Sequence, residues 1–235
     1  MYNDYVTYFY KHKEEKYMFR FANAPWLVVS GLDGSGKTTL CENLEKFFTD
    51  KKGLRVKRDR LPHDRYLVKE LLDKSNDPYT DRMLFALDNR LFAEEFRGWQ
   101  RSDEYDLVLT QRGFLDSFVH GAVQGFSYGF IADLNKAHDL PKCEVIIHLC
   151  AEAETAYERI RSDPDADKFE YIEYIRRQES ETRRAYKQLL NHNVDLECFD
   201  GALNIFVDTT EMSTDETFEY VLKRLEASGF FKMFP

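Results

Sequence analysis

The sequence is short of the features that mark secreted and membrane proteins. Its 235 residues hold four cysteines, with no C-x-x-C pair and no regular spacing, so a disulfide framework or a zinc site is disfavoured. No apolar run reaches the length of a membrane helix, and the N-terminal stretch MYNDYVTYFYKHKEEKYMFRFANAP lacks the apolar centre of a signal peptide. We therefore expect a cytoplasmic protein with reduced thiols and no membrane partner.

Basic residues are in the minority. Lys and Arg number 33 against 42 Asp and Glu, which gives a net charge of −9 and no bulk attraction to nucleic acid or to anionic membranes. Hydrophobic residues make up 43% of the chain, enough for the core of one α/β domain and too little for two. We expect a tyrosine-rich N-terminal extension over residues 1–24, of unassigned role, and a single domain over residues 25–235.

Short apolar runs alternate with amphipathic segments along the rest of the chain. Strand patterns occur at 26–30, 54–60, 105–110, 144–149 and 203–210. Helical spacing predicts helices at 39–53, 78–99, 154–162, 169–192 and 214–229, the last with Thr214 as its N-cap. This alternation is typical of a mostly parallel central sheet with helices on both faces, a three-layer α/β sandwich. Ligands of such sheets bind at the carboxyl ends of the strands.

A glycine-rich loop directly follows the first of these strands and satisfies G-x-x-x-x-G-K-[ST]. Its glycines let backbone N–H groups turn toward phosphate oxygens, and the helix that follows adds the positive end of its dipole. In such a loop Lys37 neutralises the outer phosphates and the Thr38 hydroxyl ligates Mg²⁺. The sequence therefore predicts that a nucleoside triphosphate with Mg²⁺ binds at Gly31, Leu32, Asp33, Gly34, Ser35, Gly36, Lys37, Thr38 and Thr39.

Phosphate binding leaves several classes of protein open. A GTPase carries a guanine-reading N-K-x-D, and the sequence has none. A mechanical ATPase usually has an apolar strand that ends in an acid, whereas the run LVLT is followed by Gln111. A small-molecule kinase fits the size of the chain, and it needs a second site lined by arginines.

The loop and five later segments together resemble the thymidylate kinase family, from about residue 25 onward. The segments are RLP (60–62), MLFALDNR (83–90), QRG (111–113), RIRSDPDADKFE (159–170) and FVDTT (206–210). The resemblance implies a P-loop kinase fold with a lid around residues 159–170. It also implies ATP as the phosphoryl donor, Mg²⁺, and a deoxynucleoside monophosphate, dTMP foremost, as the acceptor.

The resemblance further implies which residues contact the acceptor. Arg112, just past a buried strand, is expected to bind the acceptor phosphate bidentately. Phe85 either stacks on the base or belongs to the core. The expected acceptor-binding residues are Arg60, Arg65, Phe85, Asn89, Arg90, Arg112 and Gln124.

Three further residues are expected to take part in the chemistry with Lys37 and Arg112. Asp33 is either a functional acceptor of hydrogen bonds or a residue that suits the turn. The loop itself contains no arginine, so the resemblance implies that a lid arginine, Arg159 or Arg161, stabilises the transferring phosphoryl group. The alternative for this pair is a solvated helix face paired with Glu158.

The sequence departs from the family pattern at two places. Gln111 stands where the family has an aspartate, so Asp33 and Asp116 are the candidate substitutes. The base-reading arginine lies four residues after the phenylalanine in the family, but here that position is Asn89 and an arginine follows one residue later. One residue turns a helix by about 100°, so it is open whether Arg90 or Asn89 reaches the base, and Asn89 offers both a donor and an acceptor.

These departures keep alternatives to a dTMP kinase open. One is a bacteriophage branch of the family that phosphorylates 5-hydroxymethyluridine within DNA, although the acidic charge disfavours DNA as a partner. The other is an inactive nucleotide-binding protein, which the intact Lys37 and Thr38 disfavour. The sequence leaves the oligomeric state open to a homodimer.

Overall fold

The computed structural model describes residues 24–63, 65–161, 169, 171–192 and 194–234. Its central sheet has five parallel strands in the order β2-β3-β1-β4-β5. The strands are β1 (Trp26–Gly31), β2 (Val56–Arg60), β3 (Leu107–Gln111), β4 (Val145–Cys150) and β5 (Leu203–Asp208). All five predicted strands are confirmed, and the sheet is parallel throughout.

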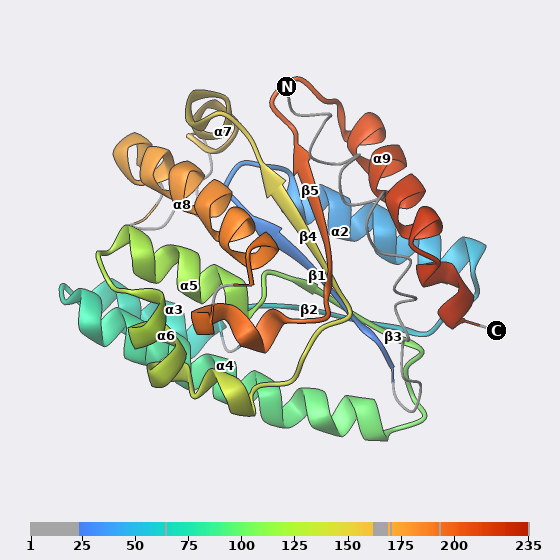
Figure 1. The fold of residues 1–235 in the computed structure, drawn as a ribbon, viewed down its shortest axis with the longest axis horizontal. Helices are drawn as coiled ribbons and strands as arrows, with labels where there is room; N and C mark the ends of the chain where they lie inside the picture. Colours follow the sequence, from blue (N-terminus) through green and yellow to red (C-terminus); the bar gives the residue numbers. More distant parts are fainter. Residues whose placement is uncertain (1–23, 64, 162–168, 170, 193, 235) are drawn as a thin grey trace.

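Helices cover both faces of the sheet (Figure 1). One face is covered by α2 (Lys37–Lys46), which runs into a π-helical turn (Phe47–Lys51), and by α9 (Thr214–Ala227). The other is covered by α4 (Pro78–Arg101), α5 (Phe114–Val123) and α8 (Ile172–Leu190). The remaining helices are α3 (Arg65–Lys74), α6 (Tyr128–Asn135) and α7 (Ala153–Ile160), with 3-10 turns at Ala137–Asp139, Val194–Phe199 and Phe230–Met233. The predicted three-layer α/β sandwich is confirmed.

The strands are apolar on both faces because each face has its own core. In β1 the side chains of Trp26 and Val28 enter the core under α4 and α5, while Leu27 and Val29 enter the core under α2 and α9. All six β1 residues are buried, as are all six of β4. Uninterrupted apolar runs of this kind are what a parallel sheet covered on both sides requires.

The register of the sheet brings the carboxyl ends of three strands together. Val29 of β1 lies beside Gln111 of β3, and Gln111 lies beside Arg60 of β2. The Arg112 backbone N–H then donates to the Val29 carbonyl at 2.8 Å. As a result, the glycine loop that follows β1 and the arginine that follows β3 leave the sheet side by side.

Some sequence predictions need correction or lie outside the described residues. The N-cap of α9 is Ser213, not Thr214: the Ser213 hydroxyl accepts from the Glu216 N–H at 3.2 Å, and Glu216 Oε2 accepts from the Ser213 N–H at 2.8 Å. Glutamate three residues after the cap closes this box, which Thr214 has no partner to form. Residues 1–23 of the expected extension and 162–168 of the expected lid lie outside the described part of the chain. Within that part, no helix combines the length and the apolar character needed to cross a membrane.

Candidate active site

The glycine loop after β1 packs so closely on its neighbours that two of its glycines are obligatory. Gly31 has a φ of 133° and Gly34 a φ of 79°. A Cβ on Gly31 would lie 1.9 Å from the Leu149 carbonyl oxygen of β4, and one on Gly34 would lie 2.2 Å from the Ala156 oxygen of α7. The loop ends at Gly36, the N-cap of α2. Its backbone therefore runs directly into a helix N-terminus, the arrangement that favours bound phosphate.

Lys37, the first residue of α2, is buried and folds back over this loop. Its Nζ donates to the carbonyls of Gly31 at 2.8 Å and Leu32 at 2.7 Å, and to Asp33 Oδ1 at 3.0 Å. Burial lowers the pKa of Lys37, and the neighbouring Asp33 carboxylate opposes that change. The ammonium is held at the centre of the loop, where phosphate oxygens would meet it.

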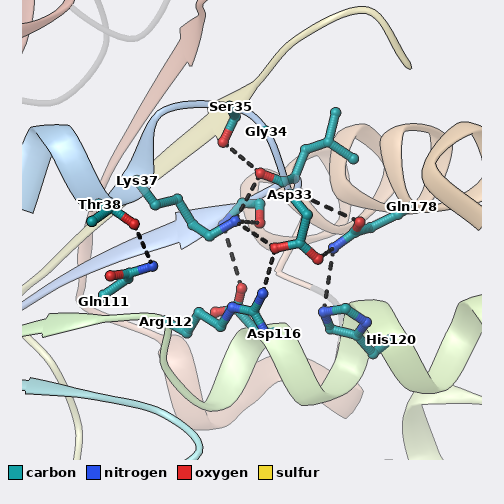
Figure 2. A network of polar contacts seen from close by, with 12 residues as sticks. Asp33, Gly34, Ser35, Lys37, Thr38, Gln111, Arg112, Asp116, His120 and Gln178 are labelled. Carbon is teal, nitrogen blue, oxygen red and sulfur yellow. Dashed lines mark hydrogen bonds and ion pairs between the residues drawn. The ribbon is translucent and has the colours of Figure 1, made fainter. Parts of the chain in front are cut away.

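Asp33 joins the loop to the residue that follows β3. Its Oδ1 accepts from Lys37 and from Arg112 Nη2, so two cations share one carboxylate oxygen (Figure 2). Burial alone would raise the pKa of Asp33, but the charges of Arg112 and Lys37 outweigh burial and hold the pKa far below its usual range. Arg112 has a φ of 68°, a left-handed conformation that is uncommon outside glycine and is often found at functional sites.

A chain of neutral polar side chains approaches Asp33 from the other side. Gln178 of α8 donates from Nε2 to Asp33 Oδ2 at 3.3 Å and lies 3.2 Å from His120 Nε2 of α5. His120 Nδ1 lies 2.8 Å from the Tyr174 hydroxyl. Because the Gln178 amide nitrogen carries only donors, His120 Nε2 accepts, which places the ring proton on Nδ1. Burial lowers the pKa of His120 to about 3, so the ring is neutral near pH 7.

Gln111 ends β3 at the position where the family pattern has an acid, and Asp116 lies in the first turn of the helix that follows. Gln111 Nε2 donates to the Thr38 hydroxyl at 3.0 Å. Asp116 Oδ2 accepts from the Gly113 N–H at 2.9 Å, at the start of α5, and burial raises the pKa of Asp116 even though Arg112 and Lys37 oppose the change. Across the described residues, no group of three or more His, Cys, Asp or Glu side chains is placed to hold a metal ion. In a phosphate loop of this kind, Mg²⁺ takes one or two protein ligands and completes its shell with phosphate and water. The solvent-exposed Thr38 hydroxyl is the protein ligand that suits it.

A cavity between α4, α5 and the end of β2 opens beside Arg112. One side is formed by Arg112 and the start of α5, and the other by α4, which contributes the aromatic ring of Phe85. Its lining consists of Leu61, Pro62, Arg82, Phe85, Asp88, Asn89, Arg112, Gly113, Asp116, Ser117 and His120.

The structure brings three of the expected acceptor-binding residues to this cavity: Phe85, Asn89 and Arg112. Asn89 Nδ2 donates to Ser117 Oγ at 2.9 Å and to Asn135 Oδ1 at 2.7 Å, so both its amide protons are used within the protein. Arg90 is not part of the lining, and its guanidinium pairs with Asp139 at 4.0 Å.

Of the other three expected acceptor residues, Gln124 and Arg60 are not part of the cavity lining. Gln124, at the end of α5, donates to Asp81 at 3.2 Å. Arg60 ends β2 next to Gln111, and Arg65 begins α3 with its side chain outside the described part of the structure.

The two lid arginines have different surroundings. Arg159, near the end of α7, donates to the Gly34 carbonyl of the glycine loop at 3.3 Å and to the Thr209 carbonyl after β5 at 2.9 Å. Arg161 is 56% exposed and pairs with Glu158 at 3.0 Å. Arg159 thus contacts the phosphate loop directly, and Arg161 lies on the solvated face considered as its alternative.

Four buried residues of the site were not among the sequence predictions: Arg82, His120, Tyr174 and Gln178. A signal for Arg82 was present, since Arg82, Phe85 and Asn89 follow the i, i+3, i+7 spacing that places side chains on one helix face. No local signal exists for Gln178, because its partner Asp33 is 145 residues away in the sequence.

The comparison with known proteins agrees with this geometry. A family model described as thymidylate kinase matches residues 29–198, from β1 through α8. The chain belongs to the thymidylate kinase family. The match includes the glycine loop, the cavity, Arg112 and both lid arginines.

The chain is also similar to curated relatives in sequence and to a solved structure in fold. It is 32% identical over 158 residues to a protein named probable thymidylate kinase from Pyrobaculum aerophilum, covering 65% of this chain and 78% of that protein. It is 27% identical over 207 residues to probable thymidylate kinase 1 from Saccharolobus solfataricus, covering 87% and 98%. The solved thymidylate kinase of Candida albicans aligns with a TM-score of 0.63 at 16% identity, over 88% of this chain and 93% of that one, which shows the shared fold.

The neutral state of His120 gives a pH prediction. The pKa of His120 is about 3 in the folded protein against a usual value of 6.5, so between these values the unfolded chain binds the proton and the folded protein does not. Stability contributed by neutral His120 is therefore present above pH 6.5 and declines as the pH falls toward 3. We expect the ring signals of His120 in an NMR titration to stay those of a neutral Nδ1-protonated imidazole down to pH 5.

If the His120 ring titrates near pH 6.5, the buried neutral chain between Tyr174 and Asp33 is contradicted.

Proposed function

We propose that the protein transfers the γ-phosphoryl group of ATP to dTMP, giving ADP and dTDP, with Mg²⁺ as the metal. The observation that carries the proposal is the Asp33–Arg112 pair, which joins the glycine loop to an arginine that lines the cavity. It offers one place where an acceptor phosphate and a bound triphosphate meet. The thymidylate kinase relatives do not favour the DNA-base kinase or the inactive protein.

The donor binds along the glycine loop. Backbone N–H groups of residues 31–39 and the N-terminus of α2 receive the phosphates, and Lys37 exchanges its contacts with the loop carbonyls for the outer phosphate oxygens. Thr38 holds Mg²⁺, which neutralises charge on the phosphates when it is bound. Arg159 bridges the loop and the turn after β5, where it is close enough to steady the transferring group.

The acceptor binds in the cavity, with its phosphate on Arg112 and its base toward Phe85. An oxygen of the dTMP phosphate attacks the γ-phosphorus, the bond from that phosphorus to the β–γ bridging oxygen breaks, and ADP leaves. The attacking phosphate is a dianion at neutral pH, so the step requires no general base. This is why a protein with Gln111 at the end of β3 can still carry out the reaction: its residues position the two phosphates and neutralise them.

The reaction is placed in the cytoplasm, where ATP and reduced thiols coexist. All four cysteines are free, and three of them are buried. Neither substrate nor metal requires any other compartment.

The direct test is transfer of label from γ-labelled ATP to a panel of dTMP, other deoxynucleoside monophosphates and DNA that contains 5-hydroxymethyluridine. We expect labelled dTDP, its loss on chelation of Mg²⁺, and a drop of about a hundredfold or more in the Lys37→Ala variant. Lys46→Ala, an exposed lysine at the end of the same helix, is the matched control and should keep wild-type turnover.

The salt dependence of acceptor binding distinguishes a monophosphate acceptor from a DNA acceptor. Binding of a small dianion weakens shallowly with salt, whereas binding of a polynucleotide releases counterions and weakens steeply. Label on DNA with none on any monophosphate, together with a steep salt dependence, would overturn the proposal in favour of the DNA-base kinase.

We also propose that two copies associate through α4. Tyr79, Met83, Leu87 and Leu91 recur every four residues along this helix and are 42–51% exposed, which forms a continuous apolar stripe. A stripe on a straight helix is complementary to itself across a two-fold axis, the commonest symmetry of homodimers. Copies that each carry a charge of −9 repel one another, so an apolar contact is the one that favours association.

Sedimentation equilibrium tests the dimer. We expect a wild-type dimer and a monomeric Leu87→Glu variant, because a charge on the stripe is buried on association. Arg101→Glu, an exposed position on the same helix and off the stripe, should stay dimeric. A monomeric wild type, or a dimeric Leu87→Glu variant, contradicts this interface.

A further inference from the structure

Arg82 is a buried cation whose hydrogen-bonding groups are not satisfied within the protein. Its side chain enters the core side of α4 and is only 2% exposed, and its Nε and Nη2 atoms have no hydrogen-bond partner. Burial lowers the pKa of Arg82 to about 10, so the guanidinium is still charged at neutral pH. An unpaired buried charge of this kind is destabilising, and such groups are found where a ligand completes the hydrogen bonding.

The guanidinium lies in the wall of the acceptor cavity beside its aromatic residue. Its central carbon is 4.6 Å from the centre of the Phe85 ring, one helical turn further along α4. Both side chains line the cavity, together with Asn89 from the next turn. Gly121 of α5 packs against the same region, where an added Cβ would clash with Ile131 Cδ1 at 2.5 Å and would lie in ordinary contact with Arg82 Cδ at 3.6 Å.

The other arginines described on α4 have partners elsewhere. Arg90 pairs with Asp139, Arg97 with Glu94, and Arg101 donates to the Arg97 carbonyl. At the opposite end of the cavity, Arg112 is placed beside the glycine loop and is suited to a phosphate. Arg82 is thus the guanidinium that meets the part of the acceptor lying over Phe85.

We infer that Arg82 reads the acceptor base by donating its unpartnered N–H groups to a carbonyl oxygen on the base edge. The inference rests on the proposed function and adds the class of base. A guanidinium has donors and no acceptor, so it pairs with the carbonyl edge of thymine or uracil. The exocyclic amino group of cytosine presents donors to donors at the same position, and it leaves the buried guanidinium unpaired.

The test compares kcat and KM for dTMP, dUMP and dCMP in the wild type and in Arg82→Met, with Arg101→Met as the matched control. For Arg82→Met we expect KM for dTMP to rise about tenfold or more with kcat little changed. The preference for dTMP over dCMP in kcat/KM should fall by a similar factor. The Tm of the ligand-free variant should be equal to or higher than that of the wild type, because an unpaired buried charge is replaced by an apolar chain of similar length.

The outcomes separate base reading from a structural role. A lower Tm with unchanged KM and unchanged preference would make Arg82 a structural residue and overturn the inference. If Arg82→Met does not fold, Arg82→Lys decides: it keeps the charge and loses the planar fork, so wild-type preference in Arg82→Lys overturns the inference and a lost preference supports it. A wild type that phosphorylates no monophosphate overturns both this inference and the proposed function, whereas active wild type with indifferent Arg82 variants overturns this inference alone.

Discussion

One buried carboxylate oxygen of Asp33, shared by Lys37 and Arg112, is the contact on which the site depends. Lys37 belongs to the donor loop, and Arg112 lines the acceptor cavity. Removal of Asp33 would take from each cation the carboxylate that it contacts directly, and breaking a buried ion pair in this way is strongly destabilising. Together with Asp33 they form a compact set in which each phosphate-binding cation is held in place by the same anion. The donor and acceptor sides are thereby fixed relative to each other by electrostatics as well as by the sheet.

The side chains that approach Asp33 from the side of α8 are polar but uncharged. Gln178 donates to its second oxygen, and His120 and Tyr174 continue the chain as neutral groups. Because burial keeps His120 neutral, the full positive charges beside Asp33 in the described part of the chain are those of Lys37 and Arg112, the two cations that we propose face phosphate. Preorganised charges and dipoles of this kind are effective in phosphoryl transfer because they need no rearrangement as charge develops.

The parts of the structure that the sequence predicted are those with local causes. The strands are long apolar runs, and the phosphate loop is a contiguous motif whose glycines are required by the backbone itself, as at Gly31. The parts it did not predict depend on contacts between distant segments. Helix α5 is buried on most of its surface, so it lacks the polar face that marks a helix, and nine of its ten residues are buried. Gln178 and Asp33 are in contact although they lie 145 residues apart in the sequence, and no periodic sequence pattern relates residues that far apart.

The acceptor side shows why a motif with one shifted residue was difficult to interpret. The cavity is lined both by Asn89, which follows Phe85 by one turn, and by Arg82, which precedes it by one turn, whereas Arg90 is not part of the lining. Residues one turn before and one turn after Phe85 lie on the same face of the helix, and only the packing shows which of them contact the cavity. The cap of α9 is similar: Ser213 and Thr214 both have suitable hydroxyls, and the position of Glu216 decides for Ser213.

The most direct test of the role of Asp33 is the binding of each substrate to Asp33→Asn, measured separately by titration calorimetry. The amide keeps the size of the side chain and removes the charge that holds both cations. The account predicts that the affinities for ATP and for dTMP fall together, each by about tenfold or more, with native circular dichroism retained. Weaker binding of one substrate with unchanged binding of the other would contradict a shared anion between the two sites.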